Sequence, residues 1–194
     1  MDPEHKSESV RKSPDPRVER TRACIAEAFA YWLLRRPYAR IRIGDITRKA
    51  QVGRATFYAH FATKDALLRA ELGRILHPMI VPLPGDPCLA DCTALFAHLQ
   101  HARAIYRSLM SGESRTITER IIQDSLEERI LRILPQANLP ANTTPAGISF
   151  VPRFVASTLL ALIAWSLEQE EAPSPELLQE LYQSLVGRAL RVEA

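Results

Sequence analysis

The chain has 194 residues, of which 46% are hydrophobic and 24% are charged, a composition typical of a globular protein that can bury a core. It contains no run of about 18 apolar residues, so we expect no transmembrane helix and no membrane partner. Residues 1–15 are polar and lack the apolar stretch of a secretory signal, which predicts a disordered tail on a cytoplasmic protein.

Charge is distributed unevenly along the chain. Residues 1–76 contain 16 Lys and Arg against 9 Asp and Glu, whereas residues 77–194 contain 9 against 13. A basic first part favours contact with a polyanion, and an acidic second part indicates a different role. Charge alone identifies no partner, so this asymmetry gains weight only if the basic part also contains a recognition element.

The chain has three cysteines, Cys24, Cys88 and Cys92. So small and odd a number does not suggest a disulfide framework, and it indicates a reducing compartment. Cys88 and Cys92 could be combined with His98 and His101 into a metal site, but the Cys-x-x-Cys spacing of zinc sites is absent. We therefore expect small apolar cysteines on helices, with no metal and no cofactor. No carboxylate pair or nucleophile–base set is evident, so no catalytic residues and no enzyme are predicted.

Apolar residues recur at helical spacing almost throughout, which predicts an all-α fold of about nine helices. Asp15 and Pro16 have the positions of a cap and a first helical residue, and Thr63 has the position of another cap. The first four helices are predicted from Pro16 to before Pro37, at about 43–50, at about 54–61, and from Thr63 to near His77.

The four prolines and one glycine in residues 78–87 predict a break in the chain. The helix at about 149–169 is apolar nearly all round and needs cover on several sides, some of which a second subunit could supply. Its Pro152 is expected in the first turn, where a proline is tolerated. The other segments predicted after the break are helices at about 89–101, 104–110, 114–134 and 175–190, and a loop at 135–147.

Residues 42–61 have the pattern of a helix-turn-helix. Phe57 and Phe61 are four residues apart and share one face of the third helix. Packed against the second helix, they can form the small core that fixes two helices at a steep angle. The other side chains available for this core are Ile46, Ala50 and Val52.

The opposite face of the third helix suits a nucleic-acid groove. Ala55 and Ala59 are small enough to let a base edge come close, and this face carries no acidic residue. Its polar members Arg54, Thr56 and Tyr58 can donate hydrogen bonds to phosphates or bases. Lys64 adds a positive charge at the start of the fourth helix, where backbone N–H groups also favour a phosphate.

The segment from Ile43 to Leu68 strongly resembles the DNA-binding domain of TetR/AcrR-type transcriptional regulators. The resemblance is carried by the pattern IT-x-x-A-x-V-x-R-x-TFY-x-HF-x-x-K-x-x-LL, and with the preceding helix it covers about residues 17–76. It implies a three-helix DNA-binding domain over 16–76 and a helical C-terminal domain over 77–194 for dimerisation and effector binding.

The resemblance also implies residue roles. Ala50, Val52, Phe57 and Phe61 would be structural. The family pattern has Gly where Gln51 stands and Ser or Thr where Gly53 stands. We therefore expect Gln51 to adopt a left-handed conformation at some cost, and Gly53 to be a weaker cap than Ser. The residues implied to contact DNA are Arg42, Arg54, Ala55, Thr56, Tyr58, His60, Thr63 and Lys64.

In the family that the chain resembles, the last two helices make the dimer, which implies an interface over about 149–190. Polar or aromatic residues within apolar helices are the candidates for a ligand pocket, although each could equally be a packing residue. These candidates are His98, Tyr106, Gln123, Ser157 and Trp165.

The function predicted on these grounds is a homodimeric repressor of a palindromic double-stranded DNA operator, released by a small apolar or amphipathic molecule. A second hypothesis keeps the DNA binding but gives the C-terminal part only dimerisation or docking of a protein. A third, an enzyme or carrier with a vestigial motif, has no catalytic constellation to support it.

Overall fold

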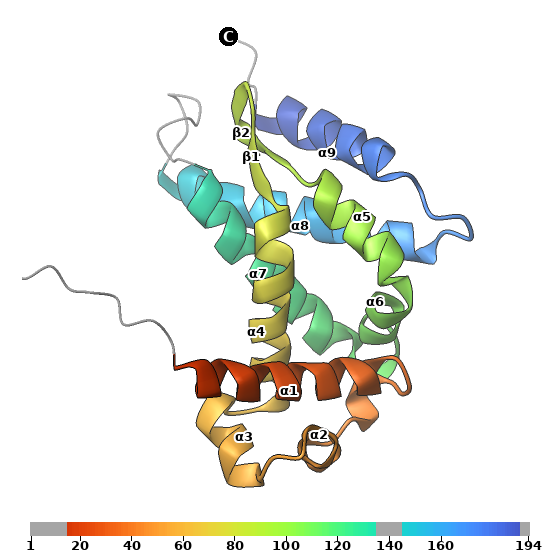
Figure 1. Ribbon diagram of the computed structural model, residues 1–194. Coiled ribbons are helices and arrows are strands. Elements are labelled where there is room, and N and C mark those ends of the chain that lie inside the picture. The colour runs from red at the N-terminus through yellow and green to blue at the C-terminus, as the bar shows by residue number, and fades with distance from the viewer. Residues whose placement is uncertain (1–14, 135–144, 191–194) are drawn as a thin grey trace, which may run out of the picture.

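The computed structural model describes residues 15–134 and 145–190 and is almost wholly helical in these ranges (Figure 1). Most of the tail predicted at 1–15 and most of the loop predicted at 135–147 lie outside the described residues. The all-α prediction is confirmed, with one small hairpin that the sequence did not predict.

The first four helices begin and end close to where their local signals predict. The Asp15 carboxylate accepts a hydrogen bond from the Arg17 N–H (2.9 Å), and the Thr63 hydroxyl accepts one from the Ala66 N–H (3.0 Å), so both predicted caps are confirmed. Observed bounds are Pro16–Leu33 for α1, Ile43–Ala50 for α2, Arg54–His60 for α3 and Lys64–Leu76 for α4, with a 3-10 turn, η1, at Tyr38–Arg40.

The predicted break contains a β-hairpin. Strands β1 (Val81–Leu83) and β2 (Asp86–Asp91) pair antiparallel, with Val81 opposite Asp91, and Gly85 supplies the positive φ of 84° at the turn. Cys88 therefore lies in a strand, and the helix predicted from residue 89 begins only at Thr93, so both expectations are wrong. The prolines on either side of Gly85 exclude a helix here, and the strand pairing then extends to residue 91.

The remaining helices are α5 (Thr93–His101), α6 (Arg103–Leu109), α7 (Arg115–Ile133), α8 (Pro145–Glu168) and α9 (Pro175–Leu190), with further 3-10 turns at His77–Met79 (η2) and Gly112–Ser114 (η3). Helices α6, α7 and α9 follow the prediction closely, whereas α5 begins four residues later than predicted. Helix α8 begins four residues earlier, at Pro145, so Pro152 lies inside the helix and not in its first turn. Because proline has no N–H to donate, α8 lacks one of its internal hydrogen bonds at Pro152.

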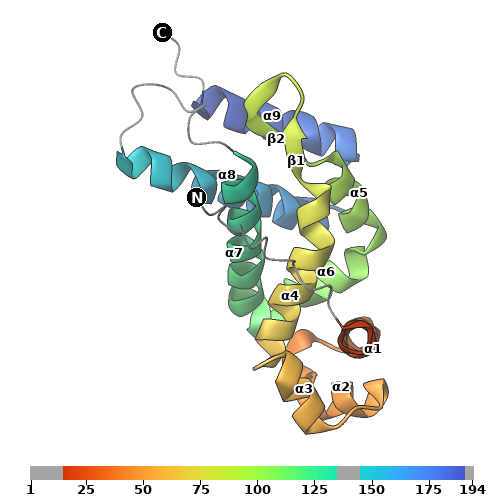
Figure 2. The same ribbon diagram turned by 60° about the vertical axis from the view of Figure 1, so that its left-hand side comes forward.

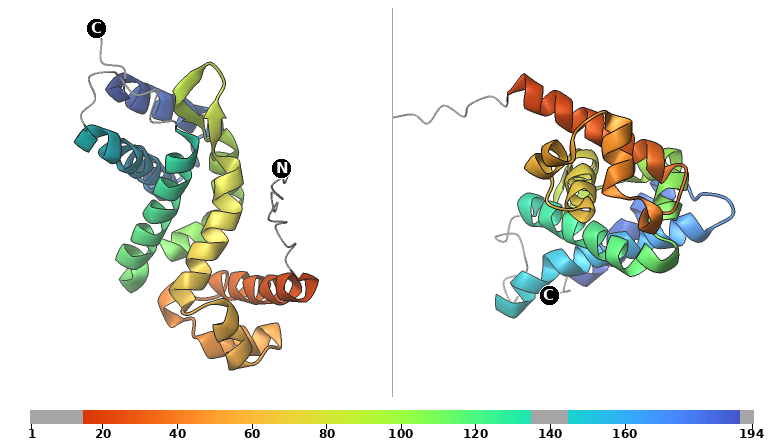
Figure 3. Two further views of the ribbon diagram at one scale, coloured as in Figure 1. Left: turned by 90° about the vertical axis from the view of Figure 1, so that its left-hand side faces the viewer. Right: turned by 90° about the horizontal axis from the view of Figure 1, so that it is seen from below.

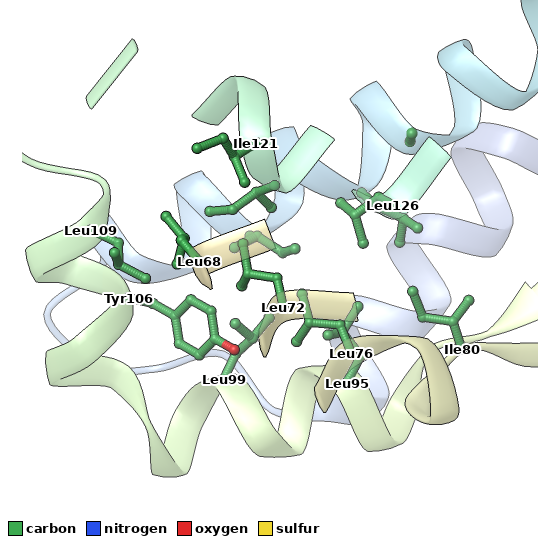
Figure 4. Close-up of a cluster of buried hydrophobic side chains, with 14 of the residues drawn as sticks. Leu68, Leu72, Leu76, Ile80, Leu95, Leu99, Tyr106, Leu109, Ile121 and Leu126 are labelled. Carbon is green, nitrogen blue, oxygen red and sulfur yellow. The ribbon is translucent and has the colours of Figure 1, made fainter. Parts of the chain in front are cut away.

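The α1–α3 end of the molecule lies opposite the hairpin and α9, and α4 runs between the two ends (Figures 1 and 2). Figure 3 shows the full length of α4 from the α3 side up to β1. The inward face of α4 contributes Leu68, Leu72 and Leu76 to a core shared with α5, α6 and α7 (Figure 4). The sequence analysis places α4 in the DNA-binding domain expected over 16–76. In the structure, α4 is also part of the C-terminal core.

Residues Ser149–Glu168 of α8 have a mean hydropathy of 1.7 and, by length and composition alone, could cross a membrane. The sequence analysis expected no transmembrane helix, because the chain has no unbroken run of about 18 apolar residues. In the fold, α8 packs against α7, α9 and α6, and this packing accounts for the apolar character of the sides that it covers.

A buried glutamine joins α9 to the hairpin. The Gln179 carbonyl oxygen accepts a hydrogen bond from the Cys92 N–H (2.9 Å), and its amide nitrogen donates to the Ala90 carbonyl oxygen (3.0 Å). Both main-chain groups are part of the step from β2 into α5. The side chain therefore satisfies a strand edge that would otherwise be buried without partners.

We expect Gln179→Leu to lower the free energy of unfolding by about 2–6 kcal/mol, because it leaves two buried main-chain groups unpaired at about 1–3 kcal/mol each. The measurement is urea denaturation followed by circular dichroism. Gln183→Leu, one turn further along α9 and partly exposed, is the control and should change stability by less than about 1 kcal/mol. Equal losses in the two variants would contradict this role.

Candidate DNA-binding surface and effector cavity

The small core predicted for the helix-turn-helix is present. Ile46 and Phe57 are fully buried, and the Phe57 and Phe61 ring centroids are 5.9 Å apart. Ala50 and Val52 are partly buried against them. The aromatic pair therefore holds α3 against the rest of the α1–α3 end and leaves its other face free.

The turn between α2 and α3 departs from its ideal form where the sequence indicated. Gln51 has φ 56° and ψ 37° and is, within 15–134 and 145–190, the one non-glycine residue with a positive φ. A left-handed residue with a Cβ costs about 1–2 kcal/mol. Gly53 caps α3 with no side-chain hydrogen bond. The left-handed conformation expected of Gln51 is confirmed, and Gly53 stands at the cap position as expected.

The outer face of α3 is solvent-exposed. Arg54, Ala55, Thr56 and Ala59 are exposed, and 54% of the Tyr58 surface is accessible. Tyr58 therefore presents both an apolar ring and a hydroxyl group on this face. His60 is partly buried, with its ring 6.2 Å from that of Phe61. Contact of these residues with DNA stays a prediction.

Gly44 is a site residue that the sequence analysis did not single out. A Cβ at this position would lie 3.2 Å from Nη2 of Arg54, which is tighter than most real contacts. The missing side chain therefore leaves room for the Arg54 guanidinium to lie across the first turn of α2. The Arg54 guanidinium of α3 thus lies beside the first turn of α2.

The start of α2 is held by Asp45. Its carboxylate accepts hydrogen bonds from the Arg42 N–H (3.2 Å) and from the Arg36 guanidinium (3.1 Å). Its main-chain carbonyl accepts one from the Trp32 indole (3.1 Å). The end of α1 is thus tied to the first turn of α2, while the Arg42 side chain remains exposed.

Lys64 points inward and not only toward solvent. Its ammonium group donates to the carbonyl oxygens of Tyr38 (2.7 Å) and Ile41 (3.0 Å) and lies 4.0 Å from the Tyr38 ring centroid. Burial lowers the pKa of Lys64. The neighbouring Asp65 carboxylate accepts a short hydrogen bond from the Tyr38 hydroxyl. The structure therefore gives Lys64 a positioning role, holding η1 ahead of α2, which the sequence prediction of a phosphate contact did not include.

A cavity of about 620 Å³ lies between α1, α4, α5 and α6, and we call it the interhelix cavity. Of the five pocket candidates, His98 and Tyr106 line it. Tyr106 lies among Leu68, Leu72 and Leu109 (Figure 4). The walls from α1 and α4 were not predicted, because the family resemblance places effector binding in the domain after residue 76.

Two uncharged polar side chains in the lining of this cavity form a pair. Nε2 of His98 and the Tyr106 hydroxyl share a hydrogen bond of 3.2 Å, and their rings are 5.8 Å apart. Burial lowers the pKa of His98, and burial raises the pKa of Tyr106. Both side chains are therefore uncharged near pH 7, since an unperturbed histidine already titrates at about 6.5.

The other three pocket candidates lie elsewhere. The Gln123 amide donates to the Ser157 hydroxyl (2.8 Å) and so links α7 to α8, and Trp165 is 40% exposed on α8. None of the three lines the interhelix cavity. Helical spacing shows that residues share a face but not which neighbour that face meets, so a role of these three residues in ligand binding stays a prediction.

The face of α6 away from the cavity is bonded to the end of α8. Nε of Arg107 donates to the Leu167 carbonyl oxygen (2.6 Å), and its Nη2 donates to that of Gln169 (3.0 Å). Arg103 donates to the same two carbonyl oxygens and to that of Glu170. Two cations thus satisfy carbonyl groups that a helix C-terminus leaves without partners.

Within the residues whose side chains are described, no group of three or more His, Cys, Asp or Glu is arranged to hold a metal ion. Cys92 is buried at the start of α5, and burial raises the pKa of its thiol. A buried, protonated thiol is a packing group and not a metal ligand.

We expect Lys64→Met to lower the free energy of unfolding by about 1–3 kcal/mol, because two buried carbonyl groups lose a charged donor. The slope of log K against log salt for DNA binding should stay unchanged, since the ammonium group is used inside the protein. Denaturation curves and salt titrations of DNA binding measure the two effects. A slope smaller by about one unit would instead show that Lys64 neutralises a phosphate.

Comparisons with known proteins agree with this geometry. The sequence model of bacterial regulatory proteins of the tetR family matches residues 32–70. An HTH-type transcriptional regulator of Bacillus subtilis, YxbF, is 30% identical over an alignment of 174 residues, which covers 86% of this chain and 44% of that protein. The chain therefore spans less than half the length of this curated relative.

Two solved structures share the fold. A TetR transcriptional regulator from Streptococcus agalactiae 2603V has a TM-score of 0.55 at 20% identity, covering 88% of this chain and 95% of that chain. The dihydroxyacetone kinase operon activator DhaS has a TM-score of 0.57 at 19% identity, covering 88% and 96%. Residues 32–70 therefore match the helix-turn-helix segment of bacterial regulatory proteins of the tetR family, and the described part of the chain shares the fold of these two solved regulators.

Proposed function

We propose that the protein is a homodimeric repressor that binds a palindromic operator in the cytoplasm and releases it when a small molecule binds. The observation that carries the DNA-binding part is the exposed outer face of α3, with Arg54 and Tyr58 beside small side chains. Arg and Tyr supply donors, and the alanines allow a groove wall to come close.

The proposed contacts divide into two groups. Arg54, Ala55 and Thr56 begin α3 and would meet base edges in the major groove. The others would hold the backbone of the duplex through phosphates, which makes affinity fall as salt rises. These backbone contacts are Arg42, Tyr58, His60 and Thr63, whereas Lys64 acts from inside the protein by holding η1 ahead of α2.

The homodimer is supported by an apolar stripe on α9. Leu177, Leu181 and Leu185 are four residues apart, so they share one face, and the first and last are exposed. Phe150 and Trp165 add exposed aromatic area on α8. A second copy would cover these side chains, and two recognition helices would then read half-sites one turn or more apart.

Ligand release is supported by the interhelix cavity. Its volume of about 620 Å³ is within the range of small-molecule sites. A ligand that favours one spacing of the two α3 helices over another would shift the dimer between DNA-binding and non-binding states.

The alternative is a constitutive regulator whose C-terminal part only dimerises or docks a protein. It is favoured by the α9 stripe, which could receive another protein in place of a second copy. The likeness to an operon activator such as DhaS is a likeness of fold and does not choose between repression and activation.

We expect Arg54→Ala and Tyr58→Ala each to weaken binding to the DNA upstream of the protein's own coding region by about tenfold or more, because each removes a direct contact. Arg120→Ala, an exposed arginine on α7, removes the same charge away from both proposed surfaces and should change affinity by less than about twofold. Gel-shift or anisotropy titrations at fixed salt measure the affinities. Unchanged binding in both α3 variants would remove the proposed surface.

We expect Leu185→Glu to convert the dimer to a monomer and to weaken operator binding by at least about tenfold, because it places a charge in an apolar interface. Leu131→Glu is the matched control, since Leu131 on α7 is 51% exposed and Leu185 is 53% exposed. Analytical ultracentrifugation gives the oligomeric state. A monomeric parent protein, or a dimeric Leu185→Glu variant, would contradict the interface.

A further inference from the structure

We propose that the interhelix cavity binds an amphipathic organic cation, with an apolar body between α1, α4 and α6 and a positively charged group at the carboxylates of α1. The inference rests on the proposed function, since it names the class of effector and the place where it acts. It is carried by the position of the cavity, the shape of its walls and the balance of charge around it.

The walls are apolar where the body of a ligand would lie. Helix α1 contributes Phe29 and Leu33, α4 contributes Leu72, and α6 contributes Ile105 and Leu109. The α1 side is also lined by three alanines at helical spacing, and these small side chains leave the space open. The alanines are Ala23, Ala26 and Ala30.

The charged groups around the cavity are three carboxylates and two guanidinium groups. Arg74 is bonded to Glu71 through both Nε (3.0 Å) and Nη2 (2.7 Å), so these two charges offset each other. Arg22 lies over the Phe61 ring, 5.4 Å from its centroid. Two carboxylates of α1, those of Glu19 and Glu27, form no ion pair with any residue in the described part of the chain.

The polar pair inside the cavity adds no positive charge. His98 and Tyr106 are bonded to each other and are uncharged, as argued above. They can offer one hydrogen bond to a ligand but no counter-charge to an anion. The lining therefore has an excess of one negative charge, which favours a cation and disfavours an anion of the same shape.

The position of the cavity explains how such a ligand would act. One wall, α1, belongs to the α1–α3 end, whereas the opposite wall, α6, is bonded through Arg103 and Arg107 to the end of α8. A molecule between α1 and α6 would hold them apart. Since a packed core is poorly compressible, the α1–α3 end would turn relative to α8, and α8 is part of the proposed dimer interface.

The experiment compares three probes with the same alkyl chain: decyltrimethylammonium, 1-decanol and decanesulfonate, each below its micellar concentration. Calorimetry gives binding to the full chain, and anisotropy gives release of the operator. We expect the ammonium probe to bind at least about tenfold more tightly than the sulfonate and to release the operator, because charge is the main difference between them.

The variant is Glu19→Gln with Glu27→Gln, and the control is Glu113→Gln with Glu171→Gln, two exposed carboxylates that do not line the cavity. Both change the net charge equally. The first should weaken ammonium binding by about tenfold and the second by less than about twofold. Operator binding without a probe is measured on the same samples and shows that each variant is folded.

The outcomes separate this inference from the proposed function. Equal binding of the ammonium and sulfonate probes, or equal effects of the two double variants, would overturn the assignment of a cation. Ammonium binding that leaves the operator bound would overturn the action proposed for this cavity. A parent protein that binds no operator would contradict the proposed function itself, whereas tight ammonium binding would still support the ligand class.

Discussion

Helix α4 is shared by both halves of the molecule, because its first turn holds η1 in front of α2 and its later turns are buried in the C-terminal core. On one side it is fastened to α7, through an ion pair between Arg69 and Asp124 (2.8 Å) and through His77, whose Nε2 lies 2.9 Å from the Ser125 carbonyl oxygen. On the other side lies the interhelix cavity. The α1–α3 end can therefore move on the cavity side with less loss of packing than on the α7 side.

The helix-turn-helix combines a strained turn with a well-packed core. Gln51 is held in a left-handed conformation, and Gly53 provides a weak cap, so the local sequence stabilises this turn poorly. Burial of Ile46 and Phe57 offsets that cost, since each fully buried side chain of this size contributes about 1.5–3 kcal/mol. A helix of seven residues has little stability of its own, so the position of α3 depends mainly on tertiary packing.

Several elements were predictable because their signals are local. Asp15 and Thr63 cap helices through groups only two or three residues away, and Pro37 limits α1 through its own ring. The hairpin was missed because its pairing joins residues ten apart and its edge is satisfied by Gln179, nearly ninety residues further along the chain. The start of α8 was misplaced because Pro152 was treated as a helix boundary, whereas packing tolerates it inside the helix.

By itself the sequence determined the helical class, the helix-turn-helix and which face of α3 is turned away from its core, because each follows from the spacing of residues along one or two adjacent helices. Only the tertiary structure decided that Lys64 bonds to the η1 carbonyl groups, that Gly44 makes room for Arg54, and that the cavity opens beside α1. These features join segments far apart in the chain, and periodicity does not show which buried faces meet.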